Sequence, residues 1–155
     1  MRTRKIVLTL ATLFAAVTIC FATQDAFMGT WKLNEAKSKI PAGSGKMVTS
    51  VYVATADGVK VTADGLDARG DPTRAEWTGK FDGKYYSVTG DPDVDMRSYT
   101  RVNNRTLRIR ETKGGKVVLS GTISLSADGK TRTATVTLIN AKGIKVATTR
   151  VYDKQ

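Results

Sequence analysis

The strongest candidate for ligand chemistry is a pair of side chains near the C-terminus, Arg150 and Tyr152. They end a β-type run over residues 144–152, in which side chains alternate between the two faces of a strand. The aliphatic residues Ile144 and Val146 share a face with this pair, so an interior position for them places the guanidinium and the phenol inside as well. Together these two groups can hold a carboxylate through charge-assisted hydrogen bonds. The pair therefore predicts a site for a small apolar ligand that carries an acid group.

Catalytic and metal chemistry is limited by what the sequence lacks. The 155 residues include no histidine, and the one cysteine, Cys20, lies in the N-terminal segment. Ser-His-Asp and Cys-His mechanisms are therefore excluded, as are the usual zinc, copper and non-haem iron sites. No pattern points to carboxylate, lysine or tyrosine catalysis. We expect a non-enzymatic protein with no catalytic residue, metal or cofactor.

Two short motifs resemble ion-binding loops, but their spacing favours turns. Asp91, Asp93 and Asp95 alternate as at the start of a calcium loop, yet Val102 stands at the twelfth position, where a glutamate is needed. The tripeptide GGK at residues 114–116 lacks the spacing of a phosphate-binding loop. Both motifs are predicted to be turns.

Residues 1–22 have the pattern of a secretory signal peptide. A basic stretch at residues 2–5 precedes an apolar run at residues 6–19, and residues 20–22 offer a small-residue cleavage site. This pattern predicts a secreted or periplasmic protein whose mature chain, residues 23–155, folds as one domain.

Two alternatives to cleavage are anchoring by the apolar run itself and lipidation of Cys20. The run is shorter than the ~20 residues that span a bilayer, and Ile19 is bulkier than the small residue that usually precedes a lipidated cysteine. We therefore expect no transmembrane segment in the mature chain.

The mature chain is strongly basic. The full sequence has 25 Lys and Arg against 14 Asp and Glu, and three of the basic residues lie in the leader, which leaves a net charge of +8. Such a surface attracts anions, so an anionic envelope surface is a candidate partner. The charges are dispersed, which is more typical of a solvated exterior than of a recognition stripe. Nucleic acid is disfavoured because aromatic residues make up only 7% of the chain, with one adjacent pair, Tyr85 and Tyr86.

Short β-type runs fill the mature chain and predict an all-β fold. Turn signals separate ten of them, at residues 29–34, 47–55, 59–64, 73–81, 84–89, 96–102, 105–112, 117–125, 131–139 and 144–152. Close spacing predicts a single antiparallel meander of about 8–10 strands that closes into a β-barrel, since closure removes exposed strand edges. The alternative is a β-sandwich of the immunoglobulin type, for which the chain has no Cys-Trp-Cys framework.

The first run contains a glycine two residues before a tryptophan, Gly29 and Trp31. In a small barrel this spacing suits a tryptophan that closes the base and a glycine that allows a close approach. Asn34 then suits the N-cap of a single helical turn, which residues 41–45 end.

Both ends of the mature chain resemble the calycins, the superfamily of lipocalins and fatty-acid-binding proteins. The opening GTWKL at residues 29–33 resembles the calycin first strand, and TRVYDK at residues 149–154 resembles the last strand of the fatty-acid-binding proteins. The opening is also similar to that of small secreted bacterial proteins of unassigned function. The resemblance implies a lipocalin-like barrel, although residues 34–45 are too few for the two-helix lid of the fatty-acid-binding proteins.

The resemblance also implies roles for particular residues. In the fatty-acid-binding proteins an Arg-x-Tyr in the last strand, matched here by Arg150 and Tyr152, grips the ligand's carboxylate. A second arginine comes from a neighbouring strand, for which the sequence offers Arg97, Arg101, Arg108 and Arg132. In lipocalins a basic residue near the C-terminus instead packs across the first-strand tryptophan, which implies a closure role for Arg150 over Trp31.

Two functions of different classes remain. One is binding or carriage of a small apolar ligand, such as a fatty-acid-like carboxylate, inside the barrel. The other is a structural or interaction module of the cell envelope, whose basic exterior binds an anionic polymer or a protein partner.

Overall fold

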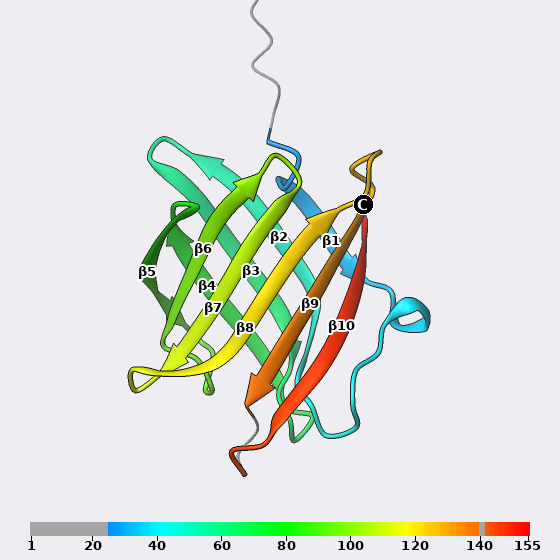
Figure 1. The fold of residues 1–155 in the computed structure, drawn as a ribbon, viewed down its shortest axis with the longest axis vertical. Helices are drawn as coiled ribbons and strands as arrows, with labels where there is room; N and C mark the ends of the chain where they lie inside the picture. Colours follow the sequence, from blue (N-terminus) through cyan, green and yellow to red (C-terminus); the bar gives the residue numbers. More distant parts are fainter. Residues whose placement is uncertain (1–24, 140–141) are drawn as a thin grey trace, which may run out of the picture.

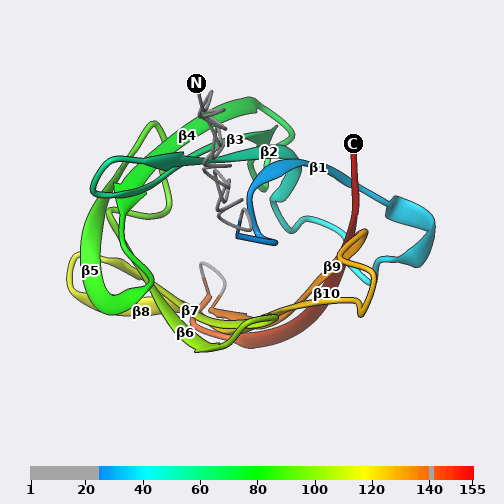
Figure 2. The ribbon, with the colours of Figure 1, turned by 90° about the horizontal axis from the view of Figure 1, so that it is seen from above.

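The chain forms one closed, ten-stranded antiparallel β-barrel (Figures 1 and 2). The computed structural model describes residues 25–139 and 142–155, so the predicted signal peptide at residues 1–22, with Cys20, lies outside the described residues. The strands are β1 (Gly29–Leu33), β2 (Lys46–Thr55), β3 (Gly58–Leu66), β4 (Pro72–Gly79), β5 (Asp82–Thr89), β6 (Met96–Asn103), β7 (Thr106–Lys113), β8 (Lys116–Leu125), β9 (Thr131–Ile139) and β10 (Lys145–Lys154). The predicted all-β barrel is confirmed, and the sandwich alternative is wrong.

Each strand pairs with its neighbour in the sequence, and β1 closes the ring between β2 and β10. Trp31 marks this closure, because it stands opposite Ser50 of β2 on one side and Lys154 of β10 on the other. Pairing is shortest between β4 and β5, where the register joins Glu76 to Thr89 and Trp77 to Val88.

The two-residue alternation read from the sequence sets which side chains face the interior. On β8, Leu119, Ile123 and Leu125 are buried, while Thr122 and Ser124 between them are exposed. Gly121 lies on the inner row, and a Cβ there would lie 2.2 Å from the Thr135 carbonyl oxygen of β9. Burial of one face thus fixes the register of each strand.

The connection between β1 and β2 contains the single turn that the sequence predicts. This 3₁₀ helix, η1 (Glu35–Lys37), is capped by Asn34, whose side chain accepts a hydrogen bond of 3.1 Å from the Lys37 N–H. The chain then runs along β10 through a bridge between Lys39 and Thr149 and reaches β2. This fully described segment has no room for a two-helix lid.

The two ends of the barrel differ. The closed end, at the top of Figure 1, carries residues 25–28 and the β4–β5 turn. The open end, at the bottom, carries the β3–β4, β5–β6, β7–β8 and β9–β10 turns. Aromatic rings fill the closed end: Phe81 lies 6.1 Å from Phe27 and 6.4 Å from Trp77, and Trp77 meets Tyr99 edge-on at 4.9 Å between ring centroids. Such pairs add to the stabilisation that burial of the rings already gives.

Candidate ligand-binding cavity

The interior of the barrel holds a cavity of about 1040 Å³ that reaches the open end. Aliphatic side chains from several strands line much of it, and they are Ala63, Ala75, Val94, Ile109, Leu119, Ile123, Ala134, Val136 and Leu138. Polar side chains line the cavity as well, among them Tyr52, Arg97, Tyr99, Glu111, Arg132, Arg150 and Tyr152, and lysines and aspartates border its mouth. An apolar cavity with a few convergent polar groups is the usual form of a small-molecule site.

Arg150 and Tyr152 both line this cavity, as the alternation of β10 predicts. The antiparallel register sets them opposite Ala134 and Arg132 of β9. Of the four arginines that the sequence offers as a second cation, the structure therefore brings Arg132 beside Tyr152.

Arg132 is 1% exposed, with its guanidinium among three aromatic rings. Its Cζ lies 4.5 Å from the ring centroid of Tyr152, 5.0 Å from that of Tyr52 and 5.1 Å from that of Trp31. Its Nη2 donates to Ser50 Oγ at 2.9 Å. Such cation–π contacts are favourable, but they do not replace hydrogen bonds to buried N–H groups.

Two nitrogens of Arg132, Nε and Nη1, are buried without a hydrogen-bond partner. The Nε of Arg150 is also buried without a hydrogen-bond partner, while the Nη2 of Arg150 donates to the Gly45 carbonyl oxygen at 2.9 Å. A buried donor left unsatisfied costs about 1–3 kcal/mol. The two arginines thus line one cavity and carry positive charge together with buried donors that no protein group accepts.

The acidity of Tyr152 reflects the same surroundings. Burial raises the pKa of its phenol, and the positive charges of Arg132 and Arg150 act in the opposite direction. Because the net pKa shift is upward, the phenol keeps its proton at neutral pH and can donate a hydrogen bond to an anion.

A second polar centre, formed by Arg97 and Glu111, is internally neutral. Arg97 Nε donates to Glu111 Oε1 at 2.5 Å, and both side chains are about nine-tenths buried. Burial by itself would lower the pKa of Arg97, but the nearby Glu111 carboxylate raises it above the ordinary value. Between the two centres the hydroxyls of Tyr52 and Tyr99 are 3.0 Å apart.

Of the buried residues that the structure describes, three are charged: Arg97, Glu111 and Arg132. Glu111 balances Arg97, and Arg132 is left without a buried counter-charge. The other two nominated arginines lie elsewhere. Arg101 is ion-paired with Asp25 beside Phe27, and Arg108 is exposed on β7.

The structure also shows which cations cover Trp31 at the closed end. Trp31 is fully buried, and its Nε1 donates to the Phe27 carbonyl oxygen at 2.9 Å. The buried Arg132 and the exposed Lys154 each lie 5.1 Å from its ring. The closure contact that the resemblance implies for Arg150 is thus made by these two residues, while Arg150 lies in the cavity wall.

Gly29 has a specific reason to be glycine. Its φ of +118° is rarely adopted by other residues, and a Cβ there would lie 2.9 Å from Lys154 Cε. The small residue therefore lets Lys154 reach the Trp31 ring.

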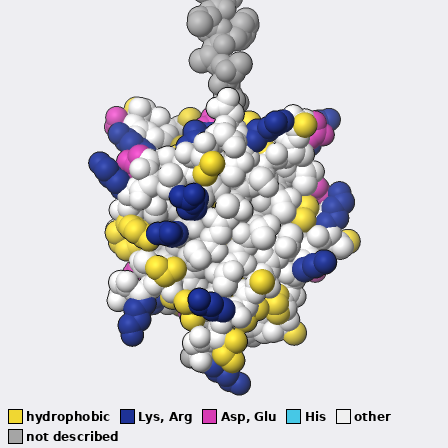
Figure 3. Space-filling view, viewed as in Figure 1, with side chains coloured by type: hydrophobic (Ala, Val, Ile, Leu, Met, Phe, Trp, Pro, Cys, Tyr) yellow, Lys and Arg dark blue, Asp and Glu magenta, His cyan; other side chains and the backbone are white. Residues whose placement is uncertain are grey.

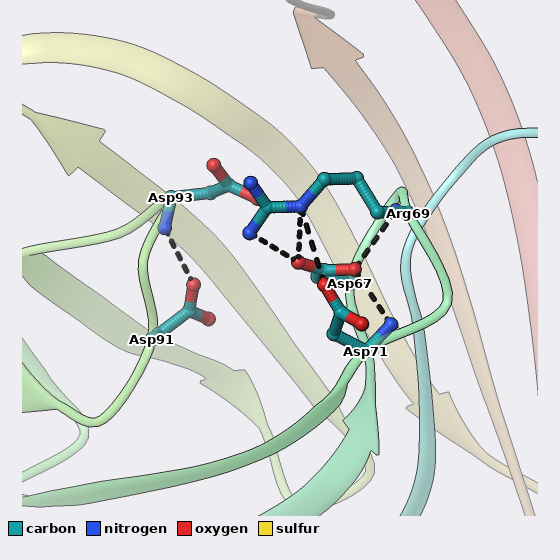
Figure 4. Close-up of polar contacts among 5 residues, drawn as sticks. All are labelled: Asp67, Arg69, Asp71, Asp91 and Asp93. Atoms are coloured by element: carbon teal, nitrogen blue, oxygen red, sulfur yellow. Dashed lines mark hydrogen bonds and ion pairs between the residues drawn. The ribbon is translucent and has the colours of Figure 1, made fainter.

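The aspartates of the calcium-like motif hold turns. Asp91 Oδ1 accepts from the Asp93 N–H at 2.9 Å (Figure 4), and Asp95 Oδ2 accepts from the Gly114 N–H at 2.7 Å. The latter hydrogen bond lowers the pKa of Asp95 and fixes the β7–β8 turn, where Gly114 and Gly115 both have positive φ. Over residues 25–139 and 142–155 no group of three or more histidine, cysteine or acidic residues could hold a metal ion.

Comparison of the chain with protein-family models and with curated proteins gave no match. Within the described part of the chain, no helix has the length and apolar character needed to cross a membrane.

The sequence analysis did not distinguish Arg132 from the other three arginines, and it did not predict the Arg97–Glu111 ion pair. The positions of Arg132 and Glu111 in their strands nevertheless indicate that both side chains face the interior. Arg132 precedes Ala134, Val136 and Leu138 on the inner row of β9, and Glu111 follows Leu107 and Ile109 on the inner row of β7. A charge that continues an apolar row is a candidate interior charge.

Proposed function

We propose that this protein is a calycin-like, non-enzymatic binding protein that holds an elongated apolar carboxylate in its barrel. The observation that carries the proposal is Arg132, a buried guanidinium in the cavity wall that has two unpartnered nitrogens and, among the residues that the structure describes, no buried counter-charge. An isolated buried charge is strongly unfavourable unless an anion accompanies it.

Arg150 and Tyr152 supply further donors for that anion. A carboxylate that accepts from Arg132 and Arg150 would compensate the excess charge, and the protonated Tyr152 would complete the set of donors. An alkyl chain would then lie along the aliphatic wall, where each buried CH₂ contributes about 0.8 kcal/mol. The predicted export of the protein fits a carrier role outside the cytoplasm, and that location remains part of the proposal.

The test compares oleate with oleyl alcohol, two ligands of equal chain length that differ in the acid group. Arg150→Gln should weaken oleate binding by about 1–3 kcal/mol, the value of a charge-assisted hydrogen bond, and leave the alcohol nearly unchanged. Arg108→Gln makes the same substitution on the exposed face of β7 and should change neither affinity. Titration calorimetry gives both affinities, and urea unfolding shows whether each variant remains folded.

Two results would contradict the proposal. One is that neither ligand binds the folded protein. The other is that Arg150→Gln weakens acid and alcohol equally. An interaction module that binds anionic polymer through its +8 exterior would instead show binding that falls steeply with salt, because exposed charges are screened beyond about 8 Å at physiological ionic strength.

A further inference from the structure

Exposed aliphatic side chains gather at one side of the cavity mouth. Val117 at the start of β8, Ile139 at the end of β9 and Ile144 just before β10 are 41%, 37% and 55% exposed, and all three border the cavity. Their strands are consecutive neighbours in the barrel. Large aliphatic side chains left in water on adjacent hairpins indicate a contact surface.

Exposed lysines flank these side chains. Lys113 and Lys116 face each other across the β7–β8 turn, and Lys145 stands opposite Ile139 in the β9–β10 pairing. Figure 3 shows hydrophobic and basic side chains side by side at the lower end of the molecule. We call this set the basic rim, and it consists of Lys113, Lys116, Val117, Ile139, Ile144 and Lys145.

The β3–β4 and β5–β6 loops of the mouth are acidic. They carry Asp67, Asp71, Asp91 and Asp93, with Arg69 as the cation between them (Figure 4). Asp67 accepts from the Asp71 and Arg69 N–H groups at 3.0 and 2.8 Å, and these hydrogen bonds lower its pKa. The cavity mouth is therefore bordered by two acidic loops in addition to the basic rim.

We propose that the basic rim docks on the surface of an anionic lipid bilayer and sets the cavity mouth against the membrane. The lysines would lie among anionic headgroups while the three aliphatic side chains enter the boundary between headgroups and acyl chains. The acidic loops are repelled by the same surface, which gives the docked molecule one preferred orientation. A purely acidic protein partner would use the lysines but gives no reason for aliphatic side chains at the mouth. The proposal stands apart from the identity of the cavity ligand.

The charge test uses vesicles of phosphatidylcholine with and without phosphatidylglycerol, and no fatty acid. Strands β1 to β10 lie within residues 29–154, so the chain from Thr23 onward is used to keep the apolar leader out of the assay. Lys113→Glu, Lys116→Glu and Lys145→Glu together should weaken binding to the anionic vesicles by roughly a hundredfold or more. The control changes three exposed lysines of the closed end, Lys80, Lys84 and Lys130, to glutamate, with the same change in net charge. It should keep affinity within about threefold of the parent protein, since only charges near the surface contribute.

The aliphatic test separates a lipid surface from any other polyanion. Ile139→Ser with Ile144→Ser should weaken vesicle binding by roughly tenfold or more and leave binding to soluble polyglutamate unchanged. Val53→Ser with Val102→Ser removes two equally exposed side chains, each 52% exposed, at the closed end and should change neither.

Three outcomes would overturn the proposal. The folded parent protein does not bind anionic vesicles, or the two lysine triples lose affinity equally, or the serine pair at the rim has no effect. The last outcome assigns the lysines to a soluble polyanion or an acidic protein. Because no acid ligand is present, all three are independent of whether oleate binds in the cavity.

Discussion

The two cations that contact the Trp31 ring differ in their surroundings. At the closed end the exposed Lys154 lies over the ring, and its Nζ also donates to the Ala26 carbonyl oxygen. In the interior Arg132 lies over the same ring at the same distance of 5.1 Å, but two of its nitrogens have no hydrogen-bond partner. Both cations contact the Trp31 ring, but Arg132, which also lines the cavity, keeps two nitrogens without a hydrogen-bond partner, whereas Lys154 is hydrogen-bonded to Ala26.

This difference in hydrogen bonding indicates which residues contribute to stability and which contribute to ligand binding. A site whose polar groups are all paired within the protein offers fewer free donors to a ligand, whereas a buried donor without a partner lowers stability and calls for an explanation, which a bound anion supplies. The closed end should therefore respond to substitution through stability, and the Arg132 region through ligand affinity.

The largest expected effect lies at the closed end. Trp31→Ala removes a fully buried ring and the hydrogen bond to Phe27, and should lower the free energy of unfolding by about 3–5 kcal/mol. Val102→Ala, at an exposed side chain of the same end, should change it by less than about 0.5 kcal/mol. Urea unfolding measures both. A loss below about 1 kcal/mol for Trp31→Ala would remove the anchoring role from this residue.

The Arg97–Glu111 pair shows whether a residue's effect on stability depends on its place in the cavity or on whether its charge is paired. Both residues line the cavity and are paired with each other, so substitution of either should lower the stability of the protein, as substitution at the closed end does. Glu111→Gln leaves a buried guanidinium without its counter-charge and should lower the free energy of unfolding by about 3 kcal/mol. The measurement is urea unfolding, with Glu76→Gln on the exposed salt bridge to Lys60 as the matched control. Equal losses for the two variants would show that burial of the pair has no energetic consequence.

A smaller effect should appear at alkaline pH. Burial raises the pKa of Tyr99 and of Tyr152 above the ordinary value near 10. Below pH 10 both phenols are protonated in folded and unfolded chains. Above it the unfolded chain ionises first, so stability falls by about 1.4 kcal/mol per pH unit for each phenol until the folded pKa is reached.

Tyr152→Phe should reduce this slope in urea unfolding between about pH 10 and 11. The control is Tyr85→Phe, since Tyr85 is 41% exposed. If the parent protein and Tyr152→Phe lose stability with the same slope, burial does not hold the proton on Tyr152.

The fold could be predicted from the sequence because its signals are local. Alternation of apolar and polar residues marks each strand, and glycine and asparagine mark the turns, so all ten runs correspond to strands. The prediction that the sheet closes into a barrel rested in addition on the meander, on Trp31 and on the resemblance of both ends of the chain to the calycins.

The cavity site could be predicted only in part. Alternation was enough to turn Arg150 and Tyr152 inward, since both lie on one strand. The choice of Arg132 among four arginines depends on the register that sets it opposite Tyr152, and the contact of Lys154 with Trp31 depends on the β1–β10 pairing. The cavity itself could not be predicted, because its presence depends on how completely side chains fill the barrel interior, and the local sequence pattern does not determine that.

Arg132→Met separates a ligand-binding role of Arg132 from a structural one, because this single substitution affects both the free energy of unfolding and the affinity for oleate. Methionine keeps an apolar side chain among the three rings and removes the uncompensated charge, so the free energy of unfolding without ligand should stay the same or rise by about 1 kcal/mol. Oleate affinity should fall by about 3 kcal/mol or more, while that of oleyl alcohol stays nearly unchanged. A loss of stability like that of Trp31→Ala, with oleate still bound, would show that Arg132 serves only the closure contact with Trp31 and does not hold the ligand's carboxylate.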